Sequence, residues 1–283
     1  MSASAPKPRD RPIAVFDSGV GGLTVLQELL VELPHEDFLY LGDTARFPYG
    51  ERSSADLERF ALEIAEVLLR RRAKLLVVAC NAASAAALDA LRERMLSTTL
   101  GVEVLGVIEP ESQLAAGTSV NRRIGLLATT ATVASGAYER AVRVHAPDAT
   151  LTSVACPDLA PIIQRGFPVD HGVVDAVRSY CSPLREAEVD TVILGCTHYP
   201  LVAPMLQRML GPGVTLISSG RSLARAVAAT LEGADLGSAR GGEGTYRFLC
   251  TGDAEAFRRI GSRFLQLPIE RVEQIELPAA VAA

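Results

Sequence analysis

Short runs of apolar residues alternate along this chain with stretches whose apolar positions recur every three to four residues. Unbroken apolar runs of four to six residues are typical of parallel strands, which are covered on both faces of their sheet. The runs predict strands at 13–16, 38–42, 75–79, 102–107, 124–128, 151–155, 191–195 and 214–218. The periodic stretches between them predict helices, among them 23–33, 53–72, 83–96, 172–186 and 201–210. This alternation predicts an α/β fold with parallel sheets.

The predicted elements repeat. The first four strands start at positions 13, 38, 75 and 102, and the next four start with similar spacing at 124, 151, 191 and 214. The sequence therefore predicts two similar α/β domains. A strand at 246–250 and a helix at 254–264 follow a glycine-rich stretch and have no counterpart in the repeat, so we expect this tail to pack back on one domain.

We therefore divide the chain into two domains and two ends. Residues 12–107, joined by the C-terminal segment 218–276, make the first domain, and residues 108–217 make the second. A polar, proline-containing segment at 1–11 reads as a disordered leader, and 277–283 as a frayed end.

Composition narrows the class of protein. The 283 residues are 48% hydrophobic and 22% charged, a globular balance, and the length favours two compact units. The net charge of −5 and the pI of about 5.5 argue against a nucleic-acid-binding protein, which needs a clustered basic face. No apolar run approaches the roughly 20 residues that span a bilayer, and the leader has no apolar core for a signal peptide. We expect a cytoplasmic protein without a membrane partner.

Neither pyridoxal phosphate nor a metal fits the sequence. The only lysines are Lys7, in the leader, and Lys74, at the start of a predicted strand, whereas sites in α/β folds lie where strands end. The four histidines lie far apart, and the nearest approach to zinc-ligand spacing is the pair Cys196 and His198. We therefore expect no cofactor.

Two cysteines occupy equivalent places in the two repeats. Cys80 lies 63 residues after Asp17, which ends the first strand of its repeat, and Cys196 lies 67 residues after Thr129. Each follows a strand, and facing domains would bring both thiols to one cleft. A thiol at a helix N-terminus has a lowered pKa, so we expect reactive thiols rather than buried structural ones. His198, two residues after Cys196, can hold or shuttle a proton.

The remaining cysteines, Cys156, Cys181 and Cys250, carry no such pattern. Five scattered cysteines are no disulfide framework, which fits a reducing compartment. Cys181 falls in a predicted helix and Cys250 in a predicted strand. Cys156 ends a strand and is the one of the three that could line the cleft.

Two loops complete the candidate site. The segment Asp17-Ser18-Gly19-Val20-Gly21-Gly22 joins a strand to a helix, and its glycines would let a ligand approach backbone N–H groups. Asp17 and the G-x-G-G spacing argue against a dinucleotide there. In the loop 43–50, Pro-Tyr-Gly can form a turn whose amides and phenol face a ligand, although a rigid surface turn is as good an interpretation.

Four segments together resemble the glutamate racemase family: FDSGVGG at 16–22, DTARFPYG at 43–50, CNAAS at 80–84 and GCTHYPL at 195–201. The resemblance runs in order over nearly the whole chain. It implies two α/β domains related by a pseudo-two-fold axis, with glutamate held in the cleft between them. It also implies a homodimer that supplies D-glutamate for peptidoglycan synthesis.

The resemblance assigns roles to residues of this chain. Cys80 would exchange the α-proton of D-glutamate with help from Asp17, and Cys196 that of L-glutamate with help from His198. The implied substrate contacts are Asp17, Ser18, Tyr49, Gly50, Asn81, Ala82, Thr197 and His198.

The chain departs from the family at two positions. Ala82 stands where the family usually has threonine, so only its backbone N–H can contact a substrate. Gln164 stands where the family usually has glutamate, so an acidic helper is missing from the second domain. Both departures bear on rate and substrate preference rather than on the type of reaction.

Other functions fit parts of the pattern. An aspartate racemase or a related thiol-dependent isomerase or decarboxylase would share the same thiols. A cysteine hydrolase with His198 as base would leave Cys80 without a role. A two-lobed amino-acid-binding protein would have the same architecture and no turnover.

Overall fold

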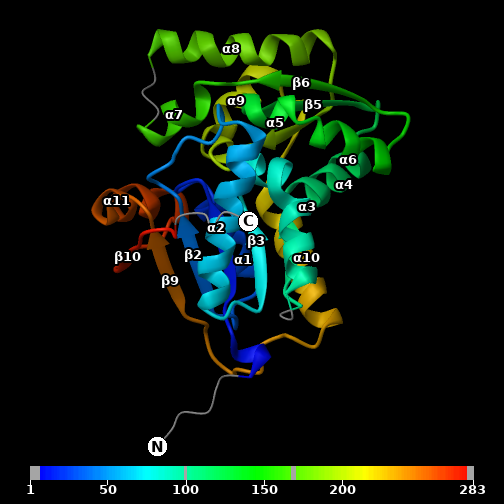
Figure 1. Ribbon diagram of the computed structural model, residues 1–283. Coiled ribbons are helices and arrows are strands. Elements are labelled where there is room, and N and C mark those ends of the chain that lie inside the picture. Colours follow the sequence, from blue (N-terminus) through cyan, green and yellow to red (C-terminus); the bar gives the residue numbers. More distant parts are fainter. Residues whose placement is uncertain (1–6, 99–100, 167–169, 279–283) are drawn as a thin grey trace, which may run out of the picture.

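The computed structural model describes residues 7–98, 101–166 and 170–278, which form two parallel sheets of different size (Figure 1). The six-stranded sheet has the order β10-β9-β2-β1-β3-β4, and the four-stranded sheet has the order β6-β5-β7-β8. The first sheet consists of β1 (Ile13–Asp17), β2 (Phe38–Gly42), β3 (Leu75–Val78), β4 (Glu103–Gly106), β9 (Tyr246–Cys250) and β10 (Val272–Gln274). The second consists of β5 (Arg123–Ala128), β6 (Thr150–Ala155), β7 (Thr191–Gly195) and β8 (Thr215–Ile217).

The two sheets repeat one strand order. In each, the first strand of the repeat lies between the second and the third, and the fourth lies outside the third. Every pairing in both sheets is parallel. The predicted fold class, two similar parallel-sheet α/β domains, is confirmed.

Helices cover the sheets on both faces, which explains why the central strands β1, β2, β3 and β7 are buried throughout. Along β1, Ile13 and Val15 belong to one core cluster, whereas Ala14 and Phe16 belong to the other. The helices that connect and cover the strands are α1 (Leu23–Glu32), α2 (Ser54–Arg70), α3 (Asn81–Ser97), α4 (Ile108–Thr118), α5 (Thr130–Ala134), α6 (Ala137–His145), α7 (Leu159–Gln164), α8 (His171–Glu186), α9 (Ala203–Leu210), α10 (Ser219–Gly233) and α11 (Ala254–Leu265). No helix in the part of the chain that the structure describes is long and apolar enough to cross a bilayer.

Several element boundaries differ from the prediction. Helix α3 begins at Asn81, two residues earlier than expected, with Cys80 as its N-cap residue. The helix predicted at 201–210 is divided into the 3₁₀ turn η2 (Tyr199–Val202) and α9, each of which has a proline near its start. The short, polar strand β10 was not predicted, because three residues carry too little pattern.

The C-terminal tail extends the first sheet. Strand β9 pairs with β2, and β10 pairs with β9. The tail therefore packs beside the first repeat, as Figure 1 shows in orange and red. The exact residue limits of the two domains stay a prediction, because strand pairing does not fix where one domain ends.

The two predicted loose ends have different outcomes. Part of the leader is structured, since Pro8–Asp10 form the 3₁₀ turn η1, while residues 1–6 lie outside the described residues. At the other end, 279–283 also lie outside them, and only 277–278 of the predicted frayed segment are described.

Lys74 connects three segments of the chain through hydrogen bonds of its buried side chain. Its Nζ donates to Glu36 Oε2 at 2.6 Å and to the carbonyls of Arg9 and Leu236 at 2.8 Å each. The Lys74 and Glu36 side chains are both buried, so each charge depends on the other. Lys74 precedes β3 and Cys80 follows it, which places the lysine at the opposite end of that strand from the thiol.

We expect Lys74→Met to lower the free energy of unfolding by about 3–5 kcal/mol, because it leaves the Glu36 carboxylate buried without a cation. Urea unfolding at neutral pH measures the change. The double variant Lys74→Met/Glu36→Leu is the control and should recover much of the loss. Equal stability of the wild type and the single variant would contradict the assigned role of the ion pair.

Candidate active site

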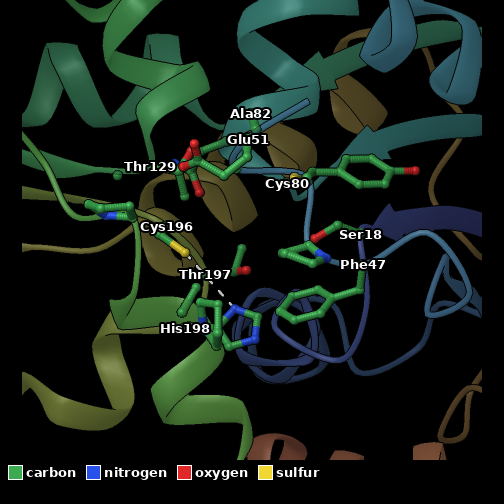
Figure 2. Close-up of a pocket in the computed structure, with 17 residues that line it drawn as sticks. Ser18, Phe47, Glu51, Cys80, Ala82, Thr129, Cys196, Thr197 and His198 are labelled. Carbon is green, nitrogen blue, oxygen red and sulfur yellow. Dashed lines mark hydrogen bonds between the residues drawn. The ribbon is translucent and has the colours of Figure 1, made fainter. Parts of the chain in front are cut away.

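A pocket lies where the carboxyl ends of the two sheets meet (Figure 2). Seventeen residues line it, and they come from strand ends of both sheets and from the loops and helices that follow those strands. They are Ser18, Phe47, Pro48, Tyr49, Gly50, Glu51, Cys80, Asn81, Ala82, Thr129, Pro157, Ala160, Pro161, Gly195, Cys196, Thr197 and His198. This is the position at which ligands bind in open α/β sheets.

The two predicted thiols line this one pocket from different domains. Cys80 follows β3 and Cys196 follows β7, the equivalent strand of the second sheet. Figure 2 shows them approaching the same space from different segments of the chain. Their exposed fractions are 6% and 7%, so the pocket walls largely exclude water from both sulfur atoms.

Burial sets the ionisation of both thiols. Burial, and to a smaller extent the Asp17 carboxylate, together raise the pKa of Cys80 to about 12, against hydrogen bonds from Ala83 and Ser18 that lower it. Burial also raises the pKa of Cys196 well above its ordinary value, and the Cys80 thiolate would add to that shift. The expectation of a lowered pKa for Cys80 is therefore wrong, because desolvation outweighs the hydrogen bond from the amide at the start of α3.

His198 lies beside Cys196 in a dry environment. Its Nδ1 is 3.9 Å from the Cys196 sulfur, and its Nε2 is 2.9 Å from Gln164 Oε1. The ring also packs against Phe47 and Phe264. Burial lowers the pKa of His198 to about 3, so the imidazole is neutral. With Nε2–H donating to Gln164, Nδ1 is left as an acceptor for the Cys196 thiol.

Asp17 lies next to the pocket without lining it. Its Oδ1 accepts a hydrogen bond from Gly19 N at 2.9 Å, and its Oδ2 accepts one from Thr197 Oγ1 at 3.3 Å. The side chain is fully buried, and burial raises its pKa despite these donors. The negative charges of Asp17 and Cys80 would repel each other, so ionisation of one group disfavours ionisation of the other.

The glycine loop serves a different purpose from the one predicted. Of residues 17–22, only Ser18 lines the pocket, so the backbone N–H groups of the glycines do not form a binding site for a ligand. A methyl group on Gly21 would lie 2.3 Å from Thr197 Oγ1 and 2.5 Å from the His198 ring. Thr24 Oγ1 also donates to the Thr197 carbonyl at 3.0 Å. Gly21 therefore allows the two domains to approach closely beside the thiols.

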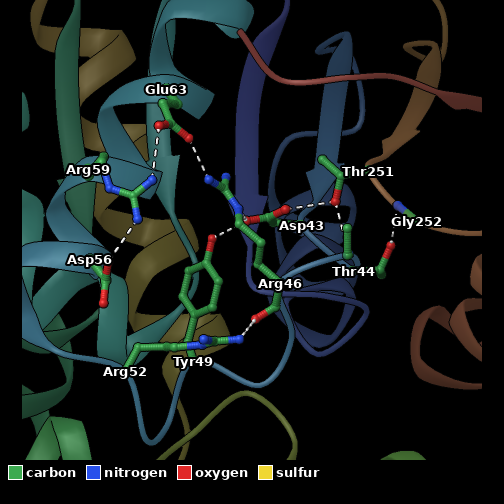
Figure 3. Close-up of polar contacts among 11 residues, drawn as sticks. Asp43, Thr44, Arg46, Tyr49, Arg52, Asp56, Arg59, Glu63, Thr251 and Gly252 are labelled. Atoms are coloured by element: carbon green, nitrogen blue, oxygen red, sulfur yellow. Dashed lines mark hydrogen bonds and ion pairs between the residues drawn. The ribbon is translucent and has the colours of Figure 1, made fainter. Parts of the chain in front are cut away.

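The loop 43–50 is held by a buried ion network (Figure 3). Asp43 Oδ2 accepts from Arg46 Nε at 2.5 Å and from the Tyr49 hydroxyl, and Asp43 Oδ1 accepts from Thr251 Oγ1 at 2.7 Å. Arg46 also pairs with Glu63 of α2. The Tyr49 phenol is thus committed to Asp43 and does not offer a free hydroxyl to a ligand.

The pocket brings together most of the predicted site residues. All of them except Asp17 line it. Gln164 does not line the pocket, but it contacts His198, which does. Sequence reasoning missed eight lining residues: Phe47, Pro48, Glu51, Thr129, Pro157, Ala160, Pro161 and Gly195. Thr129 could have been found, because it directly follows β5, the strand equivalent to β1, which Asp17 ends. Of the other cysteines, Cys156 does not line the pocket, although its neighbour Pro157 does.

The chemistry available in this pocket is proton transfer between a ligand and two thiols. Within the described residues, no group of three or more histidine, cysteine or acidic side chains is arranged to hold a metal. Two buried thiols from opposite domains can remove a proton from one face of a small ligand and return one to the other face. Each thiol has a partner close to it, Asp17 for Cys80 and His198 for Cys196.

Comparison with known proteins agrees with this geometry. Residues 24–227 match the family model for Asp/Glu/Hydantoin racemase. The chain is 46% identical to a glutamate racemase of Beutenbergia cavernae, over 93% of this chain and 92% of that one. A Bacillus anthracis glutamate racemase structure is 36% identical and superposes with a TM-score of 0.90, over 96% of this chain and 100% of the other. A Francisella tularensis glutamate racemase in complex with D-glutamate is 32% identical with a TM-score of 0.87, over 95% and 98%.

We expect Gly21→Ala to lower the free energy of unfolding by about 1–3 kcal/mol, because the added methyl group overpacks the contact with Thr197 and His198. Gly117→Ala in α4 is the matched control, since the methyl group it would add has no atom within 4 Å apart from its chain neighbours and the backbone of its own helix. That variant should be unchanged or slightly more stable. Thermal unfolding of both variants measures the difference, and equal melting temperatures would contradict the contact.

Proposed function

This chain belongs to the Asp/Glu/Hydantoin racemase family, and we propose that it interconverts L-glutamate and D-glutamate without a cofactor. The resemblance found in the four sequence segments is thereby confirmed as to family. The observation that carries the proposal is the pair of thiols, Cys80 and Cys196, at equivalent strand ends on one pocket. Racemisation requires a proton acceptor on one face of the α-carbon and a donor on the other, and this pair supplies both.

We assign the catalytic roles to four side chains. Cys80 exchanges the α-proton of D-glutamate, and Cys196 exchanges that of L-glutamate. Asp17 assists Cys80, since a proton held by Asp17 removes the charge that disfavours the thiolate. His198 assists Cys196 through the unprotonated Nδ1. One thiol must be charged while the other is neutral, and the two states exchange after each turnover.

The substrate contacts come from both sides of the pocket. Ser18, Tyr49, Gly50, Asn81 and Ala82 lie on the first domain, and Thr197 and His198 lie on the second. Ala82 and Tyr49 would contribute backbone groups, the first because it has no hydroxyl and the second because its own is bonded to Asp43. Asp17 does not line the pocket, so it would act on the substrate through Thr197, from whose hydroxyl it accepts a hydrogen bond.

The cellular setting follows from the reaction. We place the enzyme in the cytoplasm, where reducing conditions keep both thiols free, and assign its D-glutamate to peptidoglycan synthesis. We also propose a homodimer, which sedimentation of the purified protein tests. An aspartate racemase is not favoured, because the relatives that are 46% and 42% identical to this chain are named glutamate racemases.

Isotope transfer tests the two-thiol mechanism. Starting from L-glutamate in heavy water, Cys196 removes the α-hydrogen and Cys80 delivers a deuteron from solvent. We expect early D-glutamate to be almost fully deuterated at Cα, while unreacted L-glutamate keeps its hydrogen. Chiral separation with mass spectrometry measures both pools, and D-glutamate that retains the original hydrogen would refute the mechanism.

Cys80→Ala and Cys196→Ala should each abolish net inversion, because neither face can perform both halves of the reaction. The matched control is Cys181→Ala, which removes a buried thiol that does not line the pocket. It should retain turnover. Near-normal racemisation by either of the first two variants would overturn the assignment.

The pH profile of kcat/KM should be bell-shaped. Activity rises as one thiol ionises and falls when the second ionises too, because the cycle needs one thiolate and one thiol. Since burial raises the pKa of both thiols, we expect the maximum on the alkaline side of neutral. Initial rates across the pH range measure the profile, and a plateau through the alkaline region would count against paired thiols.

Gln164→Glu should raise kcat/KM for glutamate relative to aspartate, on the order of tenfold. A carboxylate in place of Gln164 Oε1 would stabilise a positive charge on His198, and a hydrogen bond to a charged group contributes about 1.5–3 kcal/mol. The ratio of kcat/KM for the two substrates measures the effect. An unchanged ratio would show that this departure from the family is neutral.

A further inference from the structure

A buried polar cluster lies behind the pocket and joins helices of both domains. It consists of Asn81 of α3, Glu111 of α4, Tyr138 of α6 and Ser219 of α10. All four side chains are at most 3% exposed. Of these residues only Asn81 lines the pocket, so the other three have no part in the site as described so far.

The Glu111 carboxylate is the centre of this cluster. Its Oε1 accepts a hydrogen bond from Ser219 Oγ at 2.7 Å, and its Oε2 accepts one from the Tyr138 hydroxyl. Asn81 Nδ2 lies 2.7 Å from the Tyr138 oxygen and 3.3 Å from Glu111 Oε2. Burial raises the pKa of Glu111 to about 8, against the three donors, which favour the charged form.

These contacts fix which way the Asn81 amide faces. If the amide were turned over, its oxygen would face the Glu111 carboxylate and the Tyr138 oxygen, whose hydrogen is already donated to Glu111. Two acceptors would then meet without a proton between them. The amide nitrogen is therefore held toward Glu111 and Tyr138, and the oxygen is held on the other side.

The Asn81 oxygen is left without a partner. Oδ1 is buried and accepts no hydrogen bond within the described residues, although Asn81 itself lines the pocket. Buried acceptors are nearly always bonded, so this atom is available to a bound ligand. The only hydrogen-bond donors of glutamate near neutral pH are the N–H groups of its α-ammonium, because both carboxylates accept.

We propose that Glu111 and Tyr138 are positioning residues that hold the Asn81 amide so that its Oδ1 accepts a hydrogen bond from the α-ammonium group of the substrate. The inference rests on the proposed function for the identity of the substrate. Asn81 directly follows Cys80, so this bond holds the ammonium group next to the α-carbon that the thiol must reach. Glu111 acts on the substrate only through the orientation of Asn81.

Two matched variants test the proposal. Tyr138→Phe and Ser219→Ala each remove one hydroxyl that donates to Glu111, but only Tyr138 also contacts Asn81. We expect both to lower the melting temperature. Only Tyr138→Phe should weaken the binding of D-glutamate, by about tenfold, as loss of a hydrogen bond to a charged group predicts. Calorimetry measures both affinities.

Glutarate identifies the group that is recognised, because it has both carboxylates and lacks the ammonium. Tyr138→Phe should change the affinity for glutarate by less than about twofold, while the affinity for glutamate falls. Glu111→Gln, which can still accept from Tyr138 and Asn81, should retain most of the glutamate affinity that Glu111→Leu loses. These variants separate orientation of the amide from loss of packing.

Three results would overturn the proposal. Equal effects of Tyr138→Phe and Ser219→Ala on glutamate affinity would make the cluster a purely structural contact. Equal losses for glutamate and glutarate would exclude the ammonium as the recognised group. Equal losses in Glu111→Gln and Glu111→Leu would exclude the orientation of Asn81. Calorimetry needs no turnover, so these outcomes differ from failure of the proposed function, in which the wild type binds glutamate without racemising it.

Discussion

The close contact between the Gly19–Gly22 loop and the Cys196–His198 turn is the constraint on which the site depends. Two thiols from separate domains can act on one carbon atom only if the domains approach within the width of a small molecule. Gly21 permits this approach, because any side chain there would meet Thr197 and His198. The hydrogen bonds from Thr24 to the Thr197 carbonyl and from Thr197 to Asp17 cross the same contact. The distance between the domains is thus set beside the reacting groups themselves.

The same closeness determines the electrostatics of the pocket. Excluding water raises the pKa values of Asp17, Cys80 and Cys196 and lowers that of His198, so every one of these groups is driven toward its neutral form. The site's own acids and base therefore contribute little charge. A bound amino acid brings an ammonium group, and its positive charge favours the thiolate that removes the α-proton. Substrate binding and activation of the thiol are therefore coupled.

The scaffold keeps the pocket walls in place from outside the pocket. The Asp43 carboxylate joins the loop 43–50 to Thr251, just after β9, so the C-terminal tail supports the loop that carries Tyr49 and Gly50. On the other side, Glu111 of α4 and Tyr138 of α6 hold Asn81 of α3. Both arrangements are buried and polar, and both connect segments far apart in the chain, which specifies one geometry at the cost of desolvation.

The sequence by itself determined the architecture and the positions of the reactive groups. Local pattern and spacing in the sequence are enough to predict the parallel strands, the two similar halves and the thiols at equivalent strand ends. Only the tertiary structure decided the direction of the thiol pKa shifts, the bond between Tyr49 and Asp43, and the role of Glu111. These depend on burial and on partners distant in sequence, as between Asp17 and Thr197, which are 180 residues apart. Local pattern cannot carry that information, because desolvation and long-range contacts exist only once the domains have packed together.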